Sequence, residues 1–193
     1  CDSRGTKSTA RLEDDKWILN GTKIFITNSA TPMTLGSTVQ VVSGEKNGKP
    51  EFTTFLMEND TPGFTQEPMN RKMMWRASNT GRLTFNNVEL TNDNMLGAPG
   101  QGSHIMLATL DGGRLSIAAM ALGCAQGAYE MALAYSKERE QFGKQICKFQ
   151  AVSFKLADMA MKIEAARCLL YKACRIKDAG MPFGKEAAMA KLY

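Results

Sequence analysis

The hydrophobic pattern of the 193-residue chain changes once, at the glycine-rich stretch 97–102. Before this stretch, short runs of β-branched and aromatic residues alternate with turn residues, which is typical of strands. After it, apolar residues recur at three- and four-residue steps, which is typical of helices. Strands followed by helices favour an α+β fold. We therefore predict a β domain over residues 1–97 and a helical domain over residues 98–193.

The first half of the chain predicts a small antiparallel β-barrel or sandwich. Residues 16–19 run into Asn20-Gly21, a dipeptide that favours a two-residue hairpin turn, and a second β-rich run follows over 22–27. Further β-rich runs separated by turn residues cover 37–42, 52–57 and 81–85. Several short strands with this spacing are typical of a closed or two-layered β structure.

The second half predicts part of an antiparallel four-helix bundle. A first helix is expected over 103–137, a second over 149–178, and a third from Gly184 to Tyr193. The first carries an apolar stripe made of Leu115, Ala118, Leu122, Ala125, Tyr129 and Leu133. Apolar residues also occupy its other faces, so we expect it to be central in the bundle. The third pattern is still helical at Tyr193, which indicates an incomplete bundle.

The distribution of charge limits the partners that can be expected. The net charge is +5, and residues 101–193 hold 13 basic against 8 acidic residues, while residues 1–100 hold 11 of each. This surplus suits a phosphate-bearing ligand, a nucleic acid or an anionic membrane, or simply a solvated face. Charges interrupt the apolar runs, so no membrane partner is expected. Exposed aromatic residues are not interleaved with the basic ones, so no nucleic-acid partner is expected either.

The same composition argues against a metal site and against disulfides. His104 is the single histidine and no C-x-x-C motif occurs, which excludes the usual zinc sites. The five cysteines show no paired spacing, which favours a reducing compartment.

Three groups of residues could bind a ligand. Phe25 and Thr27 share one face of a strand, so a ring and a hydroxyl could meet a flat ligand, although an ordinary half-buried strand has the same pattern. Residues 139–144 join two helices and could hold a phosphate and cover a base, or could be a helix end with favourable cations. Residues 111–114 place opposite charges on either side of two glycines. The glycines could leave room for a thin ligand, or the segment could simply form an ion pair.

Together these segments resemble the acyl-CoA dehydrogenase family in a single register. The matching strings are Leu19-Asn20-Gly21-Thr22-Lys23-Ile24-Phe25-Ile26-Thr27-Asn28, Asp60-Thr61-Pro62-Gly63, Trp75-Arg76-Ala77-Ser78-Asn79-Thr80, Asp111-Gly112-Gly113-Arg114 and Arg139-Glu140-Gln141-Phe142-Gly143-Lys144. Phe149-Gln150-Ala151 and Leu156-Ala157-Asp158-Met159-Ala160 continue the match. The resemblance implies the middle β domain and the first part of the C-terminal helical domain of such an enzyme.

The resemblance also implies site residues. The positions implied to bind FAD are Phe25, Ile26 and Thr27 beside the flavin and Arg139, Gln141, Phe142 and Gln150 toward the FAD of a neighbouring subunit. The positions implied to bind acyl-CoA are Cys1, Ser43, Asp111, Gly112, Gly113 and Arg114. Cys1 stands where the family usually has serine.

The implied reaction is FAD-dependent α,β-dehydrogenation of acyl-CoA thioesters. A glutamate removes the α-proton and the β-hydride passes to flavin N5. Gly113 occupies the place where a few members carry that glutamate, so the base is expected outside this chain, in a Glu-Gly-Thr segment. No catalytic residue is assigned here.

The implied partners are an electron-transferring flavoprotein and further copies of the subunit, in a tetramer built as a dimer of dimers. The implied compartment is the bacterial cytoplasm or the mitochondrial matrix. Two alternatives remain open, a related flavoprotein oxidase and a non-catalytic helical assembly module.

Overall fold

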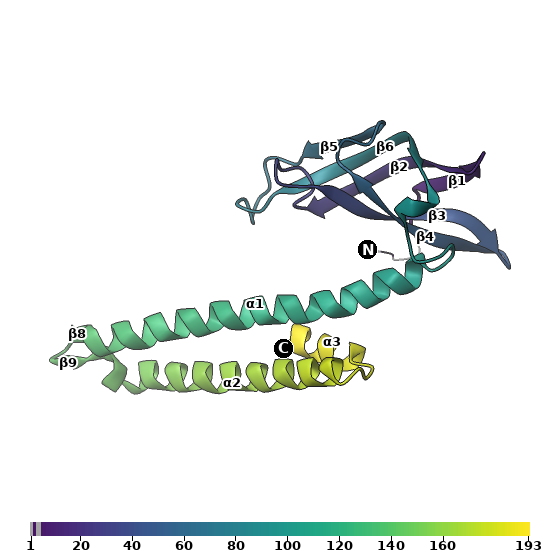
Figure 1. Ribbon diagram of the computed structural model, residues 1–193. Coiled ribbons are helices and arrows are strands. Elements are labelled where there is room, and N and C mark those ends of the chain that lie inside the picture. The colour runs from purple at the N-terminus through teal and green to yellow at the C-terminus, as the bar shows by residue number, and fades with distance from the viewer. Residues whose placement is uncertain (1, 3–4) are drawn as a thin grey trace. The chain divides into compact units, whose positions relative to one another are not determined.

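The computed structural model describes residue 2 and residues 5–193, and divides into two compact units, Cys1–Leu107 and Ala108–Tyr193. The first unit contains the strands of one large sheet, and the second contains three packed helical segments (Figure 1). The α+β class expected from the change of pattern is confirmed.

The first unit is built on a mixed sheet of seven strands. These are β1 (Thr9–Glu13), β2 (Lys16–Thr27), β3 (Gly36–Lys46), β4 (Lys49–Glu58), β5 (Phe64–Pro68), β6 (Thr80–Leu90) and β7 (Met95–Leu96), with the 3₁₀ turn η1 (Asn92–Asn94) before the last. Their order is β5-β6-β2-β1-β3-β4-β7, and all neighbours are antiparallel except β1 and β3. Of the two expected forms, the closed barrel is wrong, because β5 and β7 stay at opposite edges of the sheet and do not pair with each other.

One face of this sheet carries the core. Alternate residues of the long strands are buried together, among them Leu19, Val41, Phe55, Leu83 and Val88. Trp17 and Phe55 pack with ring centroids 5.4 Å apart, and Phe64 stacks on Phe85 at 5.3 Å. The Trp17 indole donates a hydrogen bond to Asn92 Oδ1 (2.9 Å), so the polar edge of this buried ring is satisfied.

The hairpin expected at Asn20-Gly21 does not form. Strand β2 passes through both residues without turning, and the turn lies instead at Asp14 and Asp15, whose φ angles are 45° and 66°. Gly21 has a φ of 133° at a bulge where the register with β6 shifts. A Cβ there would lie 2.7 Å from Ser8 Cα, so the glycine is needed for close backbone approach rather than for a turn.

We expect Gly21→Ala to destabilise the sheet by about 1–3 kcal/mol, because the new methyl group meets backbone atoms and the φ is strained. The midpoint of urea unfolding, followed by the fluorescence of Trp17, measures the change. Gly123→Ala is the control, since its Cβ would have no neighbour within 4 Å and alanine favours a helix interior. Equal midpoints for the two variants would contradict the close approach.

The second unit is an antiparallel helical assembly. It contains α1 (Gly102–Glu138), which begins in the first unit, then β8 (Glu140–Gln141), β9 (Lys144–Gln145), η2 (Ile146–Lys148), α2 (Gln150–Asp178) and α3 (Gly184–Leu192). Helices α1 and α2 run side by side in opposite directions from the β8–β9 hairpin (Figure 1). These bounds agree with the three expected helices.

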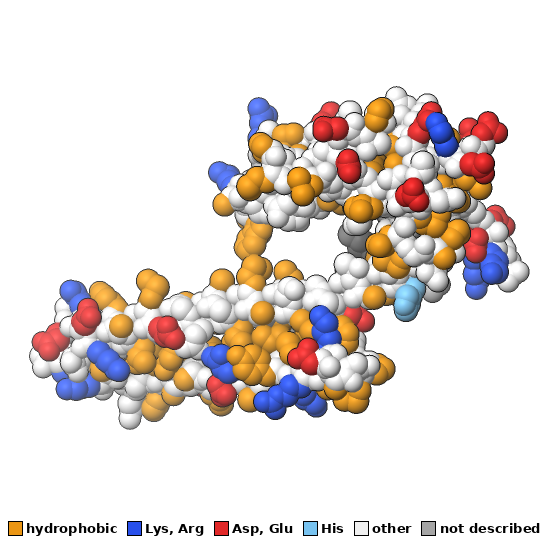
Figure 2. Space-filling model, viewed as in Figure 1, with side chains coloured by type: hydrophobic (Ala, Val, Ile, Leu, Met, Phe, Trp, Pro, Cys, Tyr) orange, Lys and Arg blue, Asp and Glu red, His pale blue; other side chains and the backbone are white. Residues whose placement is uncertain are grey.

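The helical core is a narrow seam. Hydrophobic side chains gather where the helices meet (Figure 2), and the buried ones include Leu115 and Leu122 of α1, Ile163 and Leu170 of α2 and Ala187 of α3. Leu115, Ala118 and Leu122 of the expected α1 stripe are therefore buried in this core, whereas Ala125 of the same stripe is exposed. Other faces of α1 are open, since Ile117 and Met120 are each 47% exposed. Only one side of α1 has a packing partner among the described residues.

Helix α1 also corrects the expectation that charges interrupt every apolar run. No charged residue lies between Arg114 and Glu130, and by length and composition the helix is long and apolar enough to cross a membrane. Length and composition alone do not distinguish such a span from a bundle helix. The Leu115–Leu122 stripe packs against α2, as the stripe of a bundle helix does.

Candidate functional site

A bulge near the end of β2 holds the first group of predicted residues. The register with β6 shifts between Lys23 and Ile26, and Phe25 takes a left-handed φ of 62° within the shift. Its ring is 69% exposed. Left-handed backbone at a bulky residue costs energy and is often found at functional sites. The bulge therefore presents a large aromatic ring to solvent at a conformational cost.

The neighbours of Phe25 have different environments. Ile26 packs against the sheet core, whereas Thr27 is exposed and pairs with Thr80 of β6. Lys23 precedes the bulge, and burial lowers the pKa of its ammonium group. Regular alternation would place Ile24 on the same face as Ile26, yet Ile24 is 44% exposed while Ile26 packs on the core, because the extra residue of the bulge breaks the alternation.

Ser43, the described acyl-CoA position of the first unit, lies on a different strand from this bulge. Ser43 is in β3 and its hydroxyl is 2.6 Å from the Thr53 hydroxyl, which also accepts a hydrogen bond from the Gly100 amide (3.2 Å). Ser43 is thus part of a local hydroxyl pair at a second bulge, between Val42 and Gly44. Cys1 lies outside the described residues.

The hairpin between α1 and α2 carries the second group. Gln141 pairs with Lys144, and the two residues between them, Phe142 and Gly143, have φ angles of 54° and 75°. These are the angles of a two-residue type I′ turn. Phe142 sits at the tip and is 92% exposed. The backbone carbonyl of Arg139 accepts a hydrogen bond from the Ile146 amide (2.9 Å), which closes the base of the hairpin.

The hairpin is also tied to the start of α2. The Phe142 ring meets Phe149 edge-on at 6.2 Å, and the Lys144 ammonium lies 4.5 Å from the Phe149 ring centroid. Gln150 follows directly as the first residue of α2 and is exposed. The structure thus brings Arg139, Gln141, Phe142 and Gln150 onto one helix–hairpin–helix corner. Among the described residues, the side chains of Arg139, Gln141 and Gln150 form no hydrogen bond.

The third group lies between two and three turns inside α1. Arg114 forms an ion pair with Asp111, and both side chains are partly exposed, at 36% and 31%. A Cβ added to Gly112 or Gly113 would meet nothing within 4 Å, so these glycines leave open space beside the pair. A Cβ on Gly184 of α3 would lie 2.9 Å from Asp111 Oδ2, so α3 closes the other side of the carboxylate.

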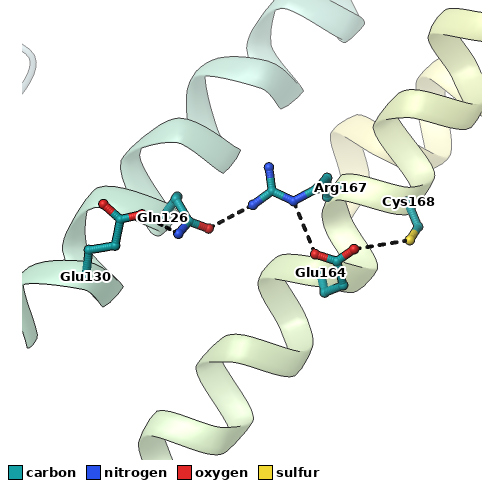
Figure 3. A network of polar contacts seen from close by, with 5 residues as sticks. All are labelled: Gln126, Glu130, Glu164, Arg167 and Cys168. Carbon is teal, nitrogen blue, oxygen red and sulfur yellow. Dashed lines mark hydrogen bonds and ion pairs between the residues drawn. The ribbon is translucent and has the colours of Figure 1, made fainter. Parts of the chain in front are cut away.

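One polar network was not predicted from the sequence. Arg167 of α2 donates to Gln126 of α1 (2.8 Å) and to Glu164 (3.2 Å), and Gln126 donates to Glu130 (2.6 Å) (Figure 3). Cys168 Sγ contacts the second Glu164 oxygen at 3.9 Å. The Glu164–Arg167 spacing could have indicated a local pair, but the contact to Gln126 depends on how α1 and α2 align.

Comparison with known proteins identifies the family of both units. Residues 1–88 match the model of the acyl-CoA dehydrogenase middle domain, and residues 100–193 match that of the acyl-CoA dehydrogenase C-terminal domain. The two matches follow one another in the family's order and leave few residues uncovered.

Similar sequences and structures agree with these models. The chain is 47% identical to the short-chain specific acyl-CoA dehydrogenase of Megasphaera elsdenii, over 98% of this chain and 49% of the relative. The solved butyryl-CoA dehydrogenase of that organism superimposes with a TM-score of 0.91, at 46% identity and with 98% and 49% of the two chains covered. The prolyl acyl carrier protein oxidase AnaB superimposes with a TM-score of 0.90, at 33% identity and with 97% and 49% covered. The chain spans about half the length of the relatives it matches, and it belongs to the acyl-CoA dehydrogenase family.

Proposed function

We propose that the protein containing this chain is an FAD-dependent dehydrogenase of short acyl-CoA thioesters. The observation that carries the proposal is the match of both units to the family in one register, at 47% identity to a short-chain specific enzyme. Because the chain spans half of that relative, the activity belongs to the whole protein. The domains are proposed to cover residues 1–97 and 98–193.

The exposed aromatic rings fit a flavin. Phe25 and Phe142 are 69% and 92% exposed, and both are held by left-handed backbone rather than by burial. A large flat ligand would remove such rings from water, which is favourable by about 25 cal/mol per Å². When bound, FAD accepts the hydride that leaves the β-carbon of the substrate.

Phe25, Ile26 and Thr27 are proposed to face the flavin ring system. The Phe25 ring would cover one side of the isoalloxazine and keep water from it. The Thr27 hydroxyl is exposed and could donate a hydrogen bond to the ring edge. Ile26 lies between Phe25 and Thr27 and holds this segment in place by packing against the sheet core.

The helix–hairpin–helix corner is proposed to bind the phosphate-bearing part of an FAD held by a neighbouring subunit. The Arg139 guanidinium suits a phosphate, and Gln141 and Gln150 can donate through their side-chain amides. Phe142 at the tip would cover the ligand. The surplus of basic residues in the second half agrees with such an anion.

Asp111 and Arg114 are proposed to line the acyl-CoA channel. The Asp111 carboxylate would accept a hydrogen bond from the pantetheine arm, and Arg114 forms an ion pair with this carboxylate. The absent side chains of Gly112 and Gly113 leave room for that thin arm. Cys1 and Ser43 are proposed to lie along the CoA moiety, and the catalytic glutamate is proposed to lie outside this chain.

The proposed partners follow the family. They are acyl-CoA, an electron-transferring flavoprotein and further subunits in a tetramer, with no nucleic acid and no membrane. The apolar faces of α1 that the described residues leave open agree with burial by more protein. The proposed compartment is the bacterial cytoplasm or the mitochondrial matrix.

The test is to purify the intact protein and titrate it anaerobically with butyryl-CoA. We expect a yellow protein whose flavin absorbance near 450 nm disappears, about one flavin per subunit, as hydride transfer to the cofactor predicts. A colourless protein that takes up no added FAD would refute the proposal and favour a non-catalytic assembly module.

An oxidase is the second candidate, because the chain is also similar to a solved oxidase at 33% identity. Oxygen consumption during turnover without any electron acceptor would support the oxidase. Reduction of an electron-transferring flavoprotein without oxygen uptake would support the dehydrogenase.

We expect Phe25→Gly to stabilise the apoprotein by about 0.5–1 kcal/mol, since glycine adopts the left-handed φ without strain. The same change should speed the reaction of the reduced flavin with oxygen, because a water-excluding ring is lost. Thermal unfolding and stopped-flow reoxidation measure the two effects. Asn28→Gly, also left-handed at a φ of 55°, is the control and should leave reoxidation unchanged. A slower or unaltered reoxidation in Phe25→Gly would contradict the role of the ring.

A further inference from the structure

The loop between β5 and β6 encloses a cavity that none of the preceding sites uses. Its volume is about 620 Å³. It is lined by two stretches, residues 68–72 and 76–80, which comprise most of the loop and the adjoining ends of the two strands and include Arg71, Lys72 and Arg76. Three of the lining residues are cations and none is an acid. The lining is thus polar and positively charged.

Two of the three cations are held in place by the loop itself. Lys72 Nζ donates to the Ser78 carbonyl and to Thr80 Oγ1 (2.9 Å). Arg76 Nε donates to the Lys72 carbonyl (3.0 Å). An ammonium has three donors and a guanidinium has five, so one donor of Lys72 and the four terminal N–H groups of Arg76 remain for a ligand.

The charge of this cluster is not balanced within the described part of the chain. The ion pairs found there involve Lys16, Arg114, Lys162 and Arg167, and none involves Arg71, Lys72 or Arg76. Like charges around one cavity repel each other, and a cavity walled by protein focuses their field. An anion that enters the cavity would remove this repulsion.

The backbone of the loop is constrained around the cluster. Arg71 and Trp75 adopt left-handed φ angles of 64° and 57°. Bulky residues in this region of backbone space are conformationally unfavourable, and such outliers gather at binding sites. Asn79 fastens the loop to the segment after β2, because its side chain exchanges two hydrogen bonds of 3.1 Å with the backbone of Ala30. The cations are thereby kept on a tethered loop.

We propose that this cavity binds a phosphate group, held by Arg71, Lys72 and Arg76. A guanidinium meets two phosphate oxygens with parallel N–H bonds, and an ammonium adds a point charge. The Ser78 and Thr80 hydroxyls can supply further hydrogen bonds. This site is separate from the residues proposed to bind FAD or acyl-CoA and does not rest on the proposed function.

The strand register places this phosphate site beside the predicted flavin residues. Thr80 lines the cavity and pairs directly with Thr27 of β2, and the Asn28 amide donates to the Asn79 carbonyl (3.1 Å). A bound phosphate would therefore lie one strand away from Thr27. The negative charge of the bound phosphate, and the restriction that it places on the loop, would both act on that end of β2.

The test is calorimetric titration of the intact protein, with its flavin content recorded by absorbance, using inorganic pyrophosphate as the probe at low ionic strength. We expect binding of one pyrophosphate per chain that weakens as salt is added. Arg71→Gln and Arg76→Gln should each weaken it about tenfold, since a hydrogen bond to a charged group is worth about 1.5–3 kcal/mol. Arg82→Gln, an exposed cation on β6 outside the lining, is the matched control and should change nothing.

The phosphate could come from a free phosphate ester or from the nucleotide end of CoA. Repeating the titration with saturating CoA separates the two sources: CoA blocks pyrophosphate if its own phosphates fill the cavity, and leaves it unchanged otherwise. The proposal is overturned if Arg71→Gln and Arg76→Gln bind pyrophosphate like Arg82→Gln. It is also overturned if a polyglutamate peptide binds more tightly than pyrophosphate, which would indicate a protein partner.

Discussion

Arg139→Ala should lower the affinity of the intact protein for FAD by about tenfold to a hundredfold. A hydrogen bond between charged groups contributes about 1.5–3 kcal/mol, and alanine removes every donor of the guanidinium. Arg139 is exposed at the end of α1 and its side chain forms no ion pair among the described residues, so the fold loses little. Quenching of flavin fluorescence during titration of the apoprotein measures the affinity.

The control is Lys137→Ala, which removes an exposed cation two residues earlier in the last turn of the same helix. It tests whether net charge alone attracts the cofactor, in which case both variants would lose affinity equally. Gel filtration of both variants separates loss of FAD from loss of assembly. If Arg139→Ala keeps both its FAD affinity and its assembly, the corner between α1 and α2 does not bind the nucleotide.

Asp111→Ala should raise the Kd for acyl-CoA by about tenfold to a hundredfold and leave FAD affinity unchanged. The proposed hydrogen bond from the pantetheine arm to a carboxylate is worth about 1.5–3 kcal/mol. The protein itself should lose less than about 1 kcal/mol of stability, because the ion pair with Arg114 is partly exposed. Spectral titration of the enzyme-bound flavin with an acyl-CoA that is not turned over measures the Kd.

Two companion variants sharpen this test. Asp158→Ala removes a carboxylate from a different ion pair, the exposed i,i+4 pair with Lys162 (3.9 Å), and should leave acyl-CoA affinity unchanged. Gly184→Ala places a methyl group against Asp111 Oδ2, and should weaken acyl-CoA binding in the same direction by a smaller factor. If the Asp111→Ala and Asp158→Ala enzymes bind acyl-CoA with equal affinity, Asp111 does not line the acyl-CoA channel.

The helices could be predicted closely because their signals are local. The three-and-four spacing of Leu115, Ala118 and Leu122 determines which side of α1 can be buried, whatever packs on it. How much of α1 is buried could not be predicted, since most of the helix is exposed in the described part of the chain although apolar residues occupy all its faces.

The sheet was harder to predict because strand pairing joins distant residues. Asn20-Gly21 has the composition of a turn, yet β6 pairs with β2 on both sides of it, so the strand continues through a bulge instead of turning. The real turn at Asp14 and Asp15 lacks glycine, and the open sheet edges depend on contacts that no local pattern encodes.

The sequence alone was enough to determine the α+β class, the position of each helix and the family, because periodicity and motif spacing are properties of neighbouring residues. Only the tertiary structure showed the strained bulge under Phe25, the hairpin that gathers the corner from Arg139 to Gln150, and the cation-lined cavity of the β5–β6 loop. Each of these depends on backbone angles and on cross-strand or cross-helix contacts. Such features form when segments that are distant in the sequence come together, so no single segment contains all the residues that stabilise them.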